Sequence, residues 1–319
     1  MTLRPGQFAP VAITSRSGID ESVHFGAVVC LDSGGSIAWS IGDSNVAIYP
    51  RSSIKPLQAV AMLEAGLCVT SEQLALVCAS HNGEQVHLET ARKILESVGL
   101  DERMLANTAG HPLDLPSAEA AIRSDVAKSP LQMNCSGKHA GMLATCVANK
   151  WSTSAYLSST HPLQQKITST IASLTNQSPF AIGIDGCGAP AHVIGLVDLA
   201  RGVRAIAIGD AGDAGNQVHR AMTNHPYMVG GRGRDVTTIM QGVPGLIAKD
   251  GAEGVFVAAL PDGRAVALKI ADGSDRSRCT VMLAALATLG VDMSALQGKL
   301  QEQVLGHGKP VGTVRAVGF

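Results

Sequence analysis

Aromatic and charged side chains are scarce in this sequence. Phe, Trp and Tyr make up 3% of the 319 residues and Asp, Glu, Lys and Arg make up 16%, whereas hydrophobic residues reach 45%. This composition excludes a disordered chain and requires a core of Ala, Val, Leu and Ile. The length fits one large domain or two closely integrated subdomains. Because no repeat or low-complexity linker divides the sequence, we expect one domain over residues 1–319, in which residues 53–175 could form an integrated helical lobe.

An excess of charge of one sign and a long apolar run are also missing. The 25 Lys and Arg residues balance 26 Asp and Glu residues without any run of like charges, which disfavours a nucleic-acid or anionic-membrane partner. Apolar runs stop well short of the ~20 residues that cross a bilayer, and Met1–Ser17 lacks the pattern of a secretory signal. The seven cysteines form an odd set, which favours reduced thiols. We therefore expect a soluble cytoplasmic protein with no nucleic-acid or membrane partner.

The spacing of apolar residues predicts strands towards both ends of the chain and helices between them. The expected strands are Val11–Thr14, Phe25–Leu31, Ser36–Trp39, Asn45–Tyr49, Ala181–Ile184, His192–Val197, Gly245–Ala248, Val255–Leu260 and Arg264–Ile270. The expected helices are Leu57–Ala65, Glu84–Val98, Ala118–Ala127, His139–Ala148, Leu163–Leu174, Arg276–Leu289 and Met293–Val304. This order indicates an α+β fold, in which segments from both ends pair in one antiparallel sheet flanked by helices and a helical lobe.

Ser52 and Lys55 stand three residues apart where a strand gives way to a helix. On one helical turn the two side chains share a face. A serine hydroxyl becomes a nucleophile when a base takes its proton, and a lysine serves as that base only when burial or a nearby cation lowers its pKa. In the alternative interpretation Ser52 is only a helix N-cap and Lys55 is solvated, because four-residue patterns also occur by accident.

Two later segments favour the catalytic interpretation. Serine acyl enzymes combine S-x-x-K with an S-x-N triplet and a late K-T-G on a strand. Here Ser80-His81-Asn82 supplies the triplet, and Lys249-Asp250-Gly251 follows an apolar strand. A second lysine in the same pocket would help to keep the first one neutral. Lys269 is a competing late lysine, but it lacks the following turn.

The segment Asn134–His139 concentrates reactive side chains. It is not a phosphate-binding loop, because Gln132 stands where glycine is required and His139 stands where Ser or Thr is required. Cys135 and His139 could join the distant Cys187 around a zinc ion. Buried free thiols are the alternative interpretation of these cysteines.

Four strings, R-S-S-I-K-P, A-S-H-N-G-E-x-x-H, N-C-S-G-K-H-A-G-M-L and G-I-D-G-C-G-A-P, occur in this order over Arg51–Glu253. The set resembles the class 3, or rhizobial-type, L-asparaginases of the asparaginase II family. This resemblance implies a fold similar to that of serine β-lactamases and glutaminases, a homodimer, and hydrolysis of L-asparagine to L-aspartate and ammonia.

At matching positions the resemblance implies two Ser-Lys tandems, Ser52 with Lys55 and Ser80 with Lys249. It also implies a zinc site with three protein ligands and, separately, a set of residues that contact the substrate. The zinc ligands are Cys135, Lys138 and Cys187, and the residues near the substrate are Arg51, His81, Asn82, Asp185 and Glu253. A lysine that binds zinc must be neutral, so the metal would displace its proton. Met133 departs from the family pattern, being less polar than expected before Asn-Cys-Ser-Gly-Lys.

These residues predict an acyl-enzyme mechanism in which Lys55, kept neutral by burial and by Lys249, deprotonates Ser52. Ser80 and Lys249 would relay protons, although the sequence leaves open which serine attacks first. A glutaminase or another acyl transferase with the same chemistry remains an alternative. A non-catalytic zinc-binding or amino-acid-binding relative is a second alternative, which the presence of both tandems disfavours.

Overall fold

The structure is a computed structural model that describes residues 2–319, and it has the predicted α+β architecture. In the described chain the main sheet has eight strands in the order β10-β11-β1-β2-β9-β8-β7, with β3 pairing with β2. Their bounds are β1 Ala9–Arg16, β2 Ile19–Leu31, β3 Ile37–Ile41, β7 Ile247–Gly251, β8 Val255–Ala259, β9 Ala265–Ile270, β10 Gln303–Gly306 and β11 Lys309–Ala316. Every neighbouring pair is antiparallel, as expected.

Segments from the two ends of the chain lie side by side in this sheet. Ala12 of β1 stands opposite Ala316 of β11, and Ala27 of β2 stands opposite Lys269 of β9. Val11 and Ala12 of β1 and every residue from Gly26 to Leu31 of β2 are buried, so the sheet is covered on both faces there. The expectation that terminal segments share one sheet is therefore confirmed.

A second sheet has three strands within residues 2–319, in the order β4-β6-β5, with bounds β4 Ala47–Ile48, β5 Ala181–Ile184 and β6 Pro190–Gly195. The turn from β5 to β6 is closed by the backbone N–H of Asp185, which donates to the carbonyl of Ala189 at 2.8 Å. Gly188 has a φ of 86°, a conformation that favours glycine. Because β4 leads directly to Arg51, this small sheet brings Arg51 close to Asp185.

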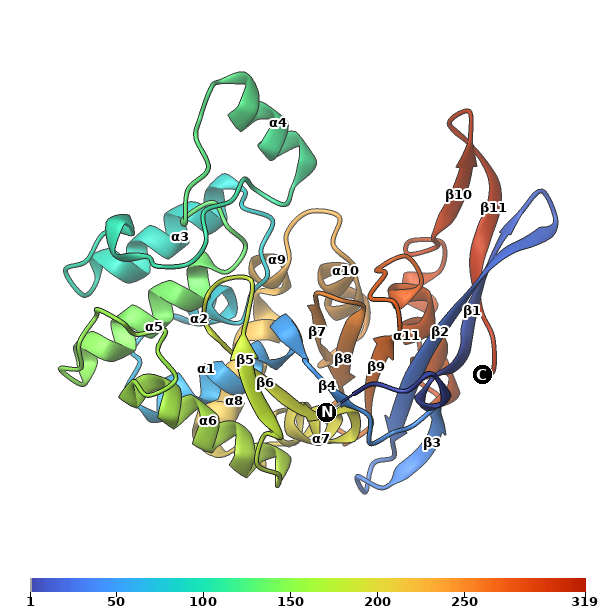
Figure 1. The fold of residues 1–319 in the computed structure, drawn as a ribbon, viewed down its shortest axis with the longest axis horizontal. Helices are drawn as coiled ribbons and strands as arrows, with labels where there is room; N and C mark the ends of the chain where they lie inside the picture. Colours follow the sequence, from blue (N-terminus) through green and yellow to red (C-terminus); the bar gives the residue numbers. More distant parts are fainter. Residues whose placement is uncertain (1) are drawn as a thin grey trace.

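The helices form most of the other half of the molecule. They are α1 Lys55–Glu64, α2 Ser71–Val77, α3 Gln85–Glu96, α4 Leu115–Arg123, α5 Ser136–Ala148, α6 Pro162–Thr175, α7 Leu196–Ala207, α8 Gly212–Asn224, α9 Pro226–Val229, α10 Asp235–Gly242 and α11 Arg278–Thr288. Figure 1 shows α1 to α6 gathered at one end of the molecule and β1, β2, β3, β10 and β11 at the other. Helix α7 packs on β8 and β9, and α11 packs on β9 and β11.

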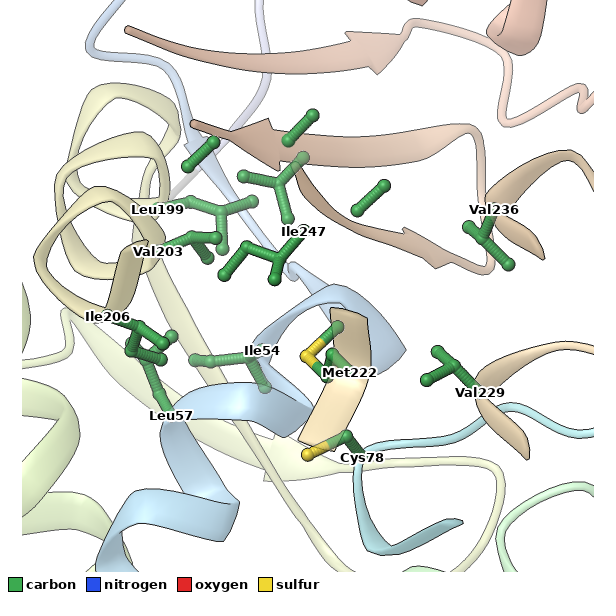
Figure 2. Close-up of a cluster of buried hydrophobic side chains, with 14 of the residues drawn as sticks. Ile54, Leu57, Cys78, Leu199, Val203, Ile206, Met222, Val229, Val236 and Ile247 are labelled. Atoms are coloured by element: carbon green, nitrogen blue, oxygen red, sulfur yellow. The ribbon is translucent and has the colours of Figure 1, made fainter. Parts of the chain in front are cut away.

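The buried core joins the helical part to the main sheet. In Figure 2, Leu199 and Val203 of α7 lie near Ile247 of β7, and Ile206 lies near Leu57 of α1. A Cβ at Gly202 of α7 would lie 2.8 Å from a terminal methyl of Leu57, so a larger residue at this position would force the Leu57 side chain to move. Each such fully buried aliphatic side chain contributes roughly 1.5–3 kcal/mol. The core thereby fixes α1, which begins at Lys55, relative to β7, which carries Lys249.

One predicted element is wrong. The expected helix Met293–Val304 is only a short 3-10 turn, Ser294–Leu296, and its end belongs to β10. Gly298 has a φ of 72°, which interrupts a right-handed helix. Val304 pairs with Gly312 of β11, so sheet pairing overrides the local helical spacing.

The structure also contains helices in segments for which the sequence predicted none. The predicted strand His192–Val197 ends at Gly195 and α7 begins at the next residue, Leu196; α2, α7, α8, α9 and α10 were not predicted. The apolar stripe of α7, Leu199, Val203 and Ile206, has helical spacing, but it directly follows a buried strand. Within residues 2–319 no helix combines the length and apolar character needed to cross a membrane.

Candidate active site

The turn that precedes α1 has an unusual backbone at Arg51. Arg51 has a φ of 54°, a left-handed conformation that costs a non-glycine residue about 1–3 kcal/mol. Its Nε donates to Asp185 Oδ1 at 2.7 Å, and its Nη1 lies 3.9 Å from Glu253 Oε1. Two carboxylates therefore hold the residue that directly precedes Ser52. The Ser53 hydroxyl donates to the Pro50 carbonyl at 2.6 Å, which leaves Ser52 as the free hydroxyl of this turn to face the pocket described below.

Lys55 is buried, with 1% of its surface exposed. Its Nζ donates to the Ser80 hydroxyl at 3.1 Å, to the Cys135 sulfur at 3.2 Å and to the carbonyl of Ala79. The interpretation of Lys55 as a solvated side chain is therefore wrong. The structure joins Lys55 to the serine of the second predicted tandem, whereas Lys55 and Ser52 meet only as walls of one pocket.

Lys249 is also fully buried, and its nearest partner is a carboxylate. Its Nζ donates to the carbonyl oxygen and to Oδ1 of Asp250, not to the hydroxyl of Ser80. Burial lowers the pKa of Lys249 to about 8, and the charge of Lys55 acts in the same direction while Asp250 opposes it. Burial alone would raise the pKa of Asp250, but the charges of Lys249 and Arg234 hold it far below its ordinary value.

Arg234 connects this ion pair to the Ser80 segment. Its Nη2 donates to Asp250 Oδ2 at 2.6 Å, and its Nη1 donates to the Ser80 carbonyl at 3.0 Å. The guanidinium has the rigid fork of donors that can span two acceptors in this way. Neither Arg234 nor Asp250 was predicted as a site residue. The only signal was the position of Asp250 directly after Lys249 in the third motif.

His81 and Asn82 use their polar atoms within the protein. His81 Nδ1 accepts from the Gly83 N–H at 3.0 Å, so its Nε2 carries the proton and donates to Ser136 Oγ at 2.9 Å. Burial holds the pKa of His81 well below its ordinary value, with neighbouring cations adding to the effect. Asn82 Nδ2 donates to the carbonyl of Arg232 at 3.0 Å. Both residues thus fix the loop that carries Ser80.

The three predicted zinc ligands lie together. Cys135 and Cys187 are 3% and 1% exposed, and Lys138 Nζ donates to Cys187 Sγ at 3.2 Å. A hydrogen bond with Cys187 holds the pKa of Cys135 well below its ordinary value, and the charges of Lys55 and Lys138 assist. No cluster of three or more His, Cys, Asp or Glu side chains in residues 2–319 is arranged to hold a metal, and Lys138 is of none of these types.

A small pocket lies between the Arg51 turn, α1 and β6. It has a volume of about 10 Å³ and is lined by predicted site residues, including Ser52, Lys55, Lys138 and Asp185. Gln58 and His192 also line it, and the sequence analysis missed both. Gln58 stands one helical turn after Lys55, which places it on the same face. His192 had no signal, since it lies within a buried apolar strand.

A buried lysine that donates to a serine hydroxyl can, once deprotonated, act as the base that activates a serine nucleophile. The model of the family described as L-asparaginase II matches residues 12–316. The chain therefore belongs to the L-asparaginase II family, and its class is that of hydrolases that act on amides.

Several solved structures are similar in part. Mglu in its native form aligns with a TM-score of 0.44 at 14% identity, over 89% of this chain and 69% of Mglu. A putative β-lactamase from Bacteroides dorei DSM 17855 aligns with 0.43 at 14% identity, over 83% and 92%. A β-lactamase from Mycobacterium bovis gives 0.37 at 14% identity, over 83% and 94%. These scores lie below 0.5, so the assignment rests on the family match, and no curated protein matches the chain.

Proposed function

We propose that the protein hydrolyses L-asparagine to L-aspartate and ammonia through an acyl-enzyme on Ser52. The observation that supports this most is the position of Lys55, a buried amine 3.1 Å from the Ser80 hydroxyl in the wall of the pocket that Ser52 lines. Ser52 is partly exposed and Ser80 is only 5% exposed, so a substrate reaches Ser52 more readily. Membership of the L-asparaginase II family gives the substrate class.

The chemistry follows from these positions. Lys55 first gives up one of the protons that it donates in the structure, and the free amine then takes the proton of Ser52, whose oxygen attacks the side-chain carboxamide carbon. The proton then passes through Lys55, with the Ser80 hydroxyl as a relay, to the nitrogen, and the C–N bond breaks to release ammonia. Water adds to the resulting ester, the bond to Ser52 Oγ breaks, and Ser52 regains a proton. Lys249, with a pKa of about 8, would act on this relay through its charge, which disfavours the charged form of the neighbouring Lys55.

The ion pairs at the Arg51 turn would select an amino acid over a plain amide. Arg51, Asp185 and Glu253 form a cluster of mixed charge beside Ser52, and Glu253 has 64% of its side chain exposed. The carboxylates of this cluster suit an α-amino group, and the guanidinium suits an α-carboxylate. Losing either charge should therefore weaken binding of asparagine more than binding of an uncharged amide.

The donor set at the thiol cluster fits zinc. Two cysteine sulfurs and a lysine nitrogen from α5 and the β5–β6 turn converge in a buried site, and sulfur and nitrogen are the donors that zinc prefers. We propose that Cys135, Lys138 and Cys187 hold one zinc ion, with Lys138 neutral. When bound, zinc would supply a fixed positive charge beside the pocket.

The homodimer and the cytoplasmic location also stay proposals, which light scattering and cell fractionation would test.

Ammonia release from L-asparagine and L-glutamine, together with D-alanine release from a D-Ala-D-Ala peptide, tests the proposed function. We expect asparagine to have the highest kcat/KM. A preference for glutamine would establish the glutaminase alternative, and turnover of the peptide would indicate an acyl transferase. A folded, zinc-loaded protein that hydrolyses none of these substrates would establish the non-catalytic alternative.

A further inference from the structure

Two buried acceptor atoms beside the Ser52 pocket lack donors. Gln58 of α1 is 4% exposed and His192 of β6 is 1% exposed. In the described part of the chain, neither Gln58 Oε1 nor His192 Nδ1 has a hydrogen-bond partner. Leaving a buried acceptor unpaired costs about 1–3 kcal/mol, so native proteins usually satisfy such atoms. Both residues line the same pocket, which makes a shared small ligand the simplest donor.

The hydrogen bonds around His192 show that its Nδ1 is a bare acceptor. The Thr168 hydroxyl donates to the Gln164 carbonyl at 2.8 Å and so spends its only proton there. Thr168 Oγ1 lies 2.8 Å from His192 Nε2, which must therefore be the donor in that contact. In a neutral imidazole the other nitrogen then carries a lone pair. His192 Nδ1 consequently requires an N–H or O–H donor.

The size and charge of the pocket restrict what can supply these donors. Its volume of about 10 Å³ corresponds to a single molecule of the size of water. Arg51 and Asp185 line it as an ion pair, so an ammonium ion would find no unpaired carboxylate there to balance its charge. A neutral molecule with two donor hydrogens and one free lone pair satisfies every one of these conditions. Water and ammonia share that chemistry.

We propose that Gln58 and His192 form a binding site for a small neutral hydrogen-bond donor, water or ammonia, beside the attacking serine. This site deepens the proposed hydrolysis and rests on it. Ammonia leaves the carboxamide carbon and water later attacks the same carbon, so one site can hold the departing ammonia and then the incoming water. With both hydrogens held by Gln58 and His192, the lone pair is free to face the ester carbon.

The role in the second half of the reaction can be written with its atoms balanced. The oxygen of the held water adds to the ester carbon, and the bond from that carbon to Ser52 Oγ breaks. As the water oxygen bonds to carbon it becomes acidic, and the proton that it had donated to the Gln58 amide oxygen leaves that oxygen, passes to Lys55 and from there reaches Ser52 Oγ. Aspartate leaves and the free serine is restored. Gln58 and His192 act as positioning residues for the water, whereas Lys55 moves the proton.

A high-resolution crystal structure of the full-length protein tests the site directly. We expect density for one ordered molecule within about 3 Å of both the Gln58 amide and His192 Nδ1. An empty pocket in an enzyme that releases ammonia would overturn the site while leaving the proposed function intact. An ordered molecule in a protein that hydrolyses no amide would overturn the role of the site and the proposed function together.

Kinetics of Gln58→Leu test the role of the site. Leucine has a similar volume and no acceptor, so we expect a first-turnover burst of ammonia, an accumulated acyl-enzyme in the mass spectrum, and steady-state turnover reduced about tenfold or more. The matched control is Gln164→Leu, which also removes a buried glutamine with an unpaired Oε1 but lies outside the pocket. An unchanged steady-state rate in a folded Gln58→Leu protein would contradict the role.

Isotope exchange separates the two sources of the ligand. The wild type is incubated with unlabelled asparagine and isotopically labelled ammonia, and recovered asparagine is analysed for label. Incorporation that Gln58→Leu loses and Gln164→Leu keeps assigns ammonia to the site as well as water. Density at the site without any incorporation in the wild type assigns water alone. Incorporation that survives Gln58→Leu undiminished contradicts a site for ammonia at Gln58.

Discussion

The Nζ of Lys55 lies 3.1 Å from the hydroxyl of Ser80, so the base of one predicted tandem is bonded to the serine of the other. The two tandems therefore form one connected group rather than two separate pairs. Lys249, the partner expected for Ser80, is linked through Asp250 and the guanidinium of Arg234 to the backbone carbonyl of Ser80 and not to its hydroxyl. Proton transfer at the site should accordingly respond to changes in any of these residues.

Replacing Ser52 by alanine should lower kcat by at least about 10²–10⁴-fold, because the nucleophile is removed. Lys55→Met should have an effect of the same order, and the double variant should be no worse than additive. The matched control is Ser53→Ala, because Ser53 is adjacent but donates to the Pro50 carbonyl. Steady-state ammonia release measures all four, with circular dichroism as the check of folding. Near-normal turnover in Ser52→Ala would move the nucleophile to another residue.

The acidic limb of kcat/KM should fall near pH 8, where Lys249 titrates. The carboxylate of Asp250 favours the charged form of Lys249, so Asp250→Asn should lower the pKa of this lysine and move the limb to lower pH. Asp275→Asn is the control, since Asp275 pairs with Arg278 and not with Lys249. Rates measured from about pH 6 to pH 10 decide the direction. A limb that moves to higher pH in Asp250→Asn would show that another group governs it.

The zinc proposal gives a definite metal content. The wild type should contain about one zinc per chain, and the Cys135→Ala, Cys187→Ala double variant should contain almost none, because both sulfur donors are lost. Cys78→Ala, Cys146→Ala is the matched control, since both of these thiols are also buried. Elemental analysis of the purified proteins provides the measurement. Full zinc content in the first double variant would contradict the site.

Two substitutions at Arg51 distinguish the role of its left-handed backbone from the role of its charge. Both Arg51→Gly and Arg51→Ala remove the ion pairs with Asp185 and Glu253 and should raise KM for asparagine. Glycine adopts the φ of 54° without strain, so Arg51→Gly should be more stable than Arg51→Ala by about 1 kcal/mol. Denaturant unfolding measures the difference. Equal stability of the two variants would mean that the turn relaxes once the side chain is lost.

The spacing of apolar residues predicted an element correctly where the structure of that element depends mainly on its own residues. The apolar segments Val11–Thr14 and Phe25–Leu31, bounded by turn residues, predicted strands that the structure extends to β1 and β2, and the helical spacing in Leu163–Leu174 predicted α6. At Met293–Val304 the same reasoning predicted a helix, because pairing of Val304 with Gly312 is not visible in local spacing. Long-range pairing of this kind overrides local preference.

The site residues likewise divide into those that a local motif marks and those that only the folded chain brings together. Ser52, Lys55 and the Cys135–Lys138 segment are marked by short motifs, and the structure places them around one pocket and one thiol cluster. Arg234 and His192 carry no motif, because they matter only through partners that are distant in sequence. A single arginine or a buried histidine has the same appearance in sequence wherever it lies, so only the folded chain reveals them.

The register of the main sheet also sets an order of events during synthesis. β2 pairs with β9 through Ala27 and Lys269, and β1 pairs with β11, so neither pairing can form until most of the chain has left the ribosome. Pairings of such long sequence separation form slowly, because the intervening loop must close first. A nascent chain therefore carries Ser52 and Lys55 long before Lys249 and its strand arrive. Hydrolytic activity should consequently appear late in translation, and the exposed edge of β2 should make chaperones most necessary before that point.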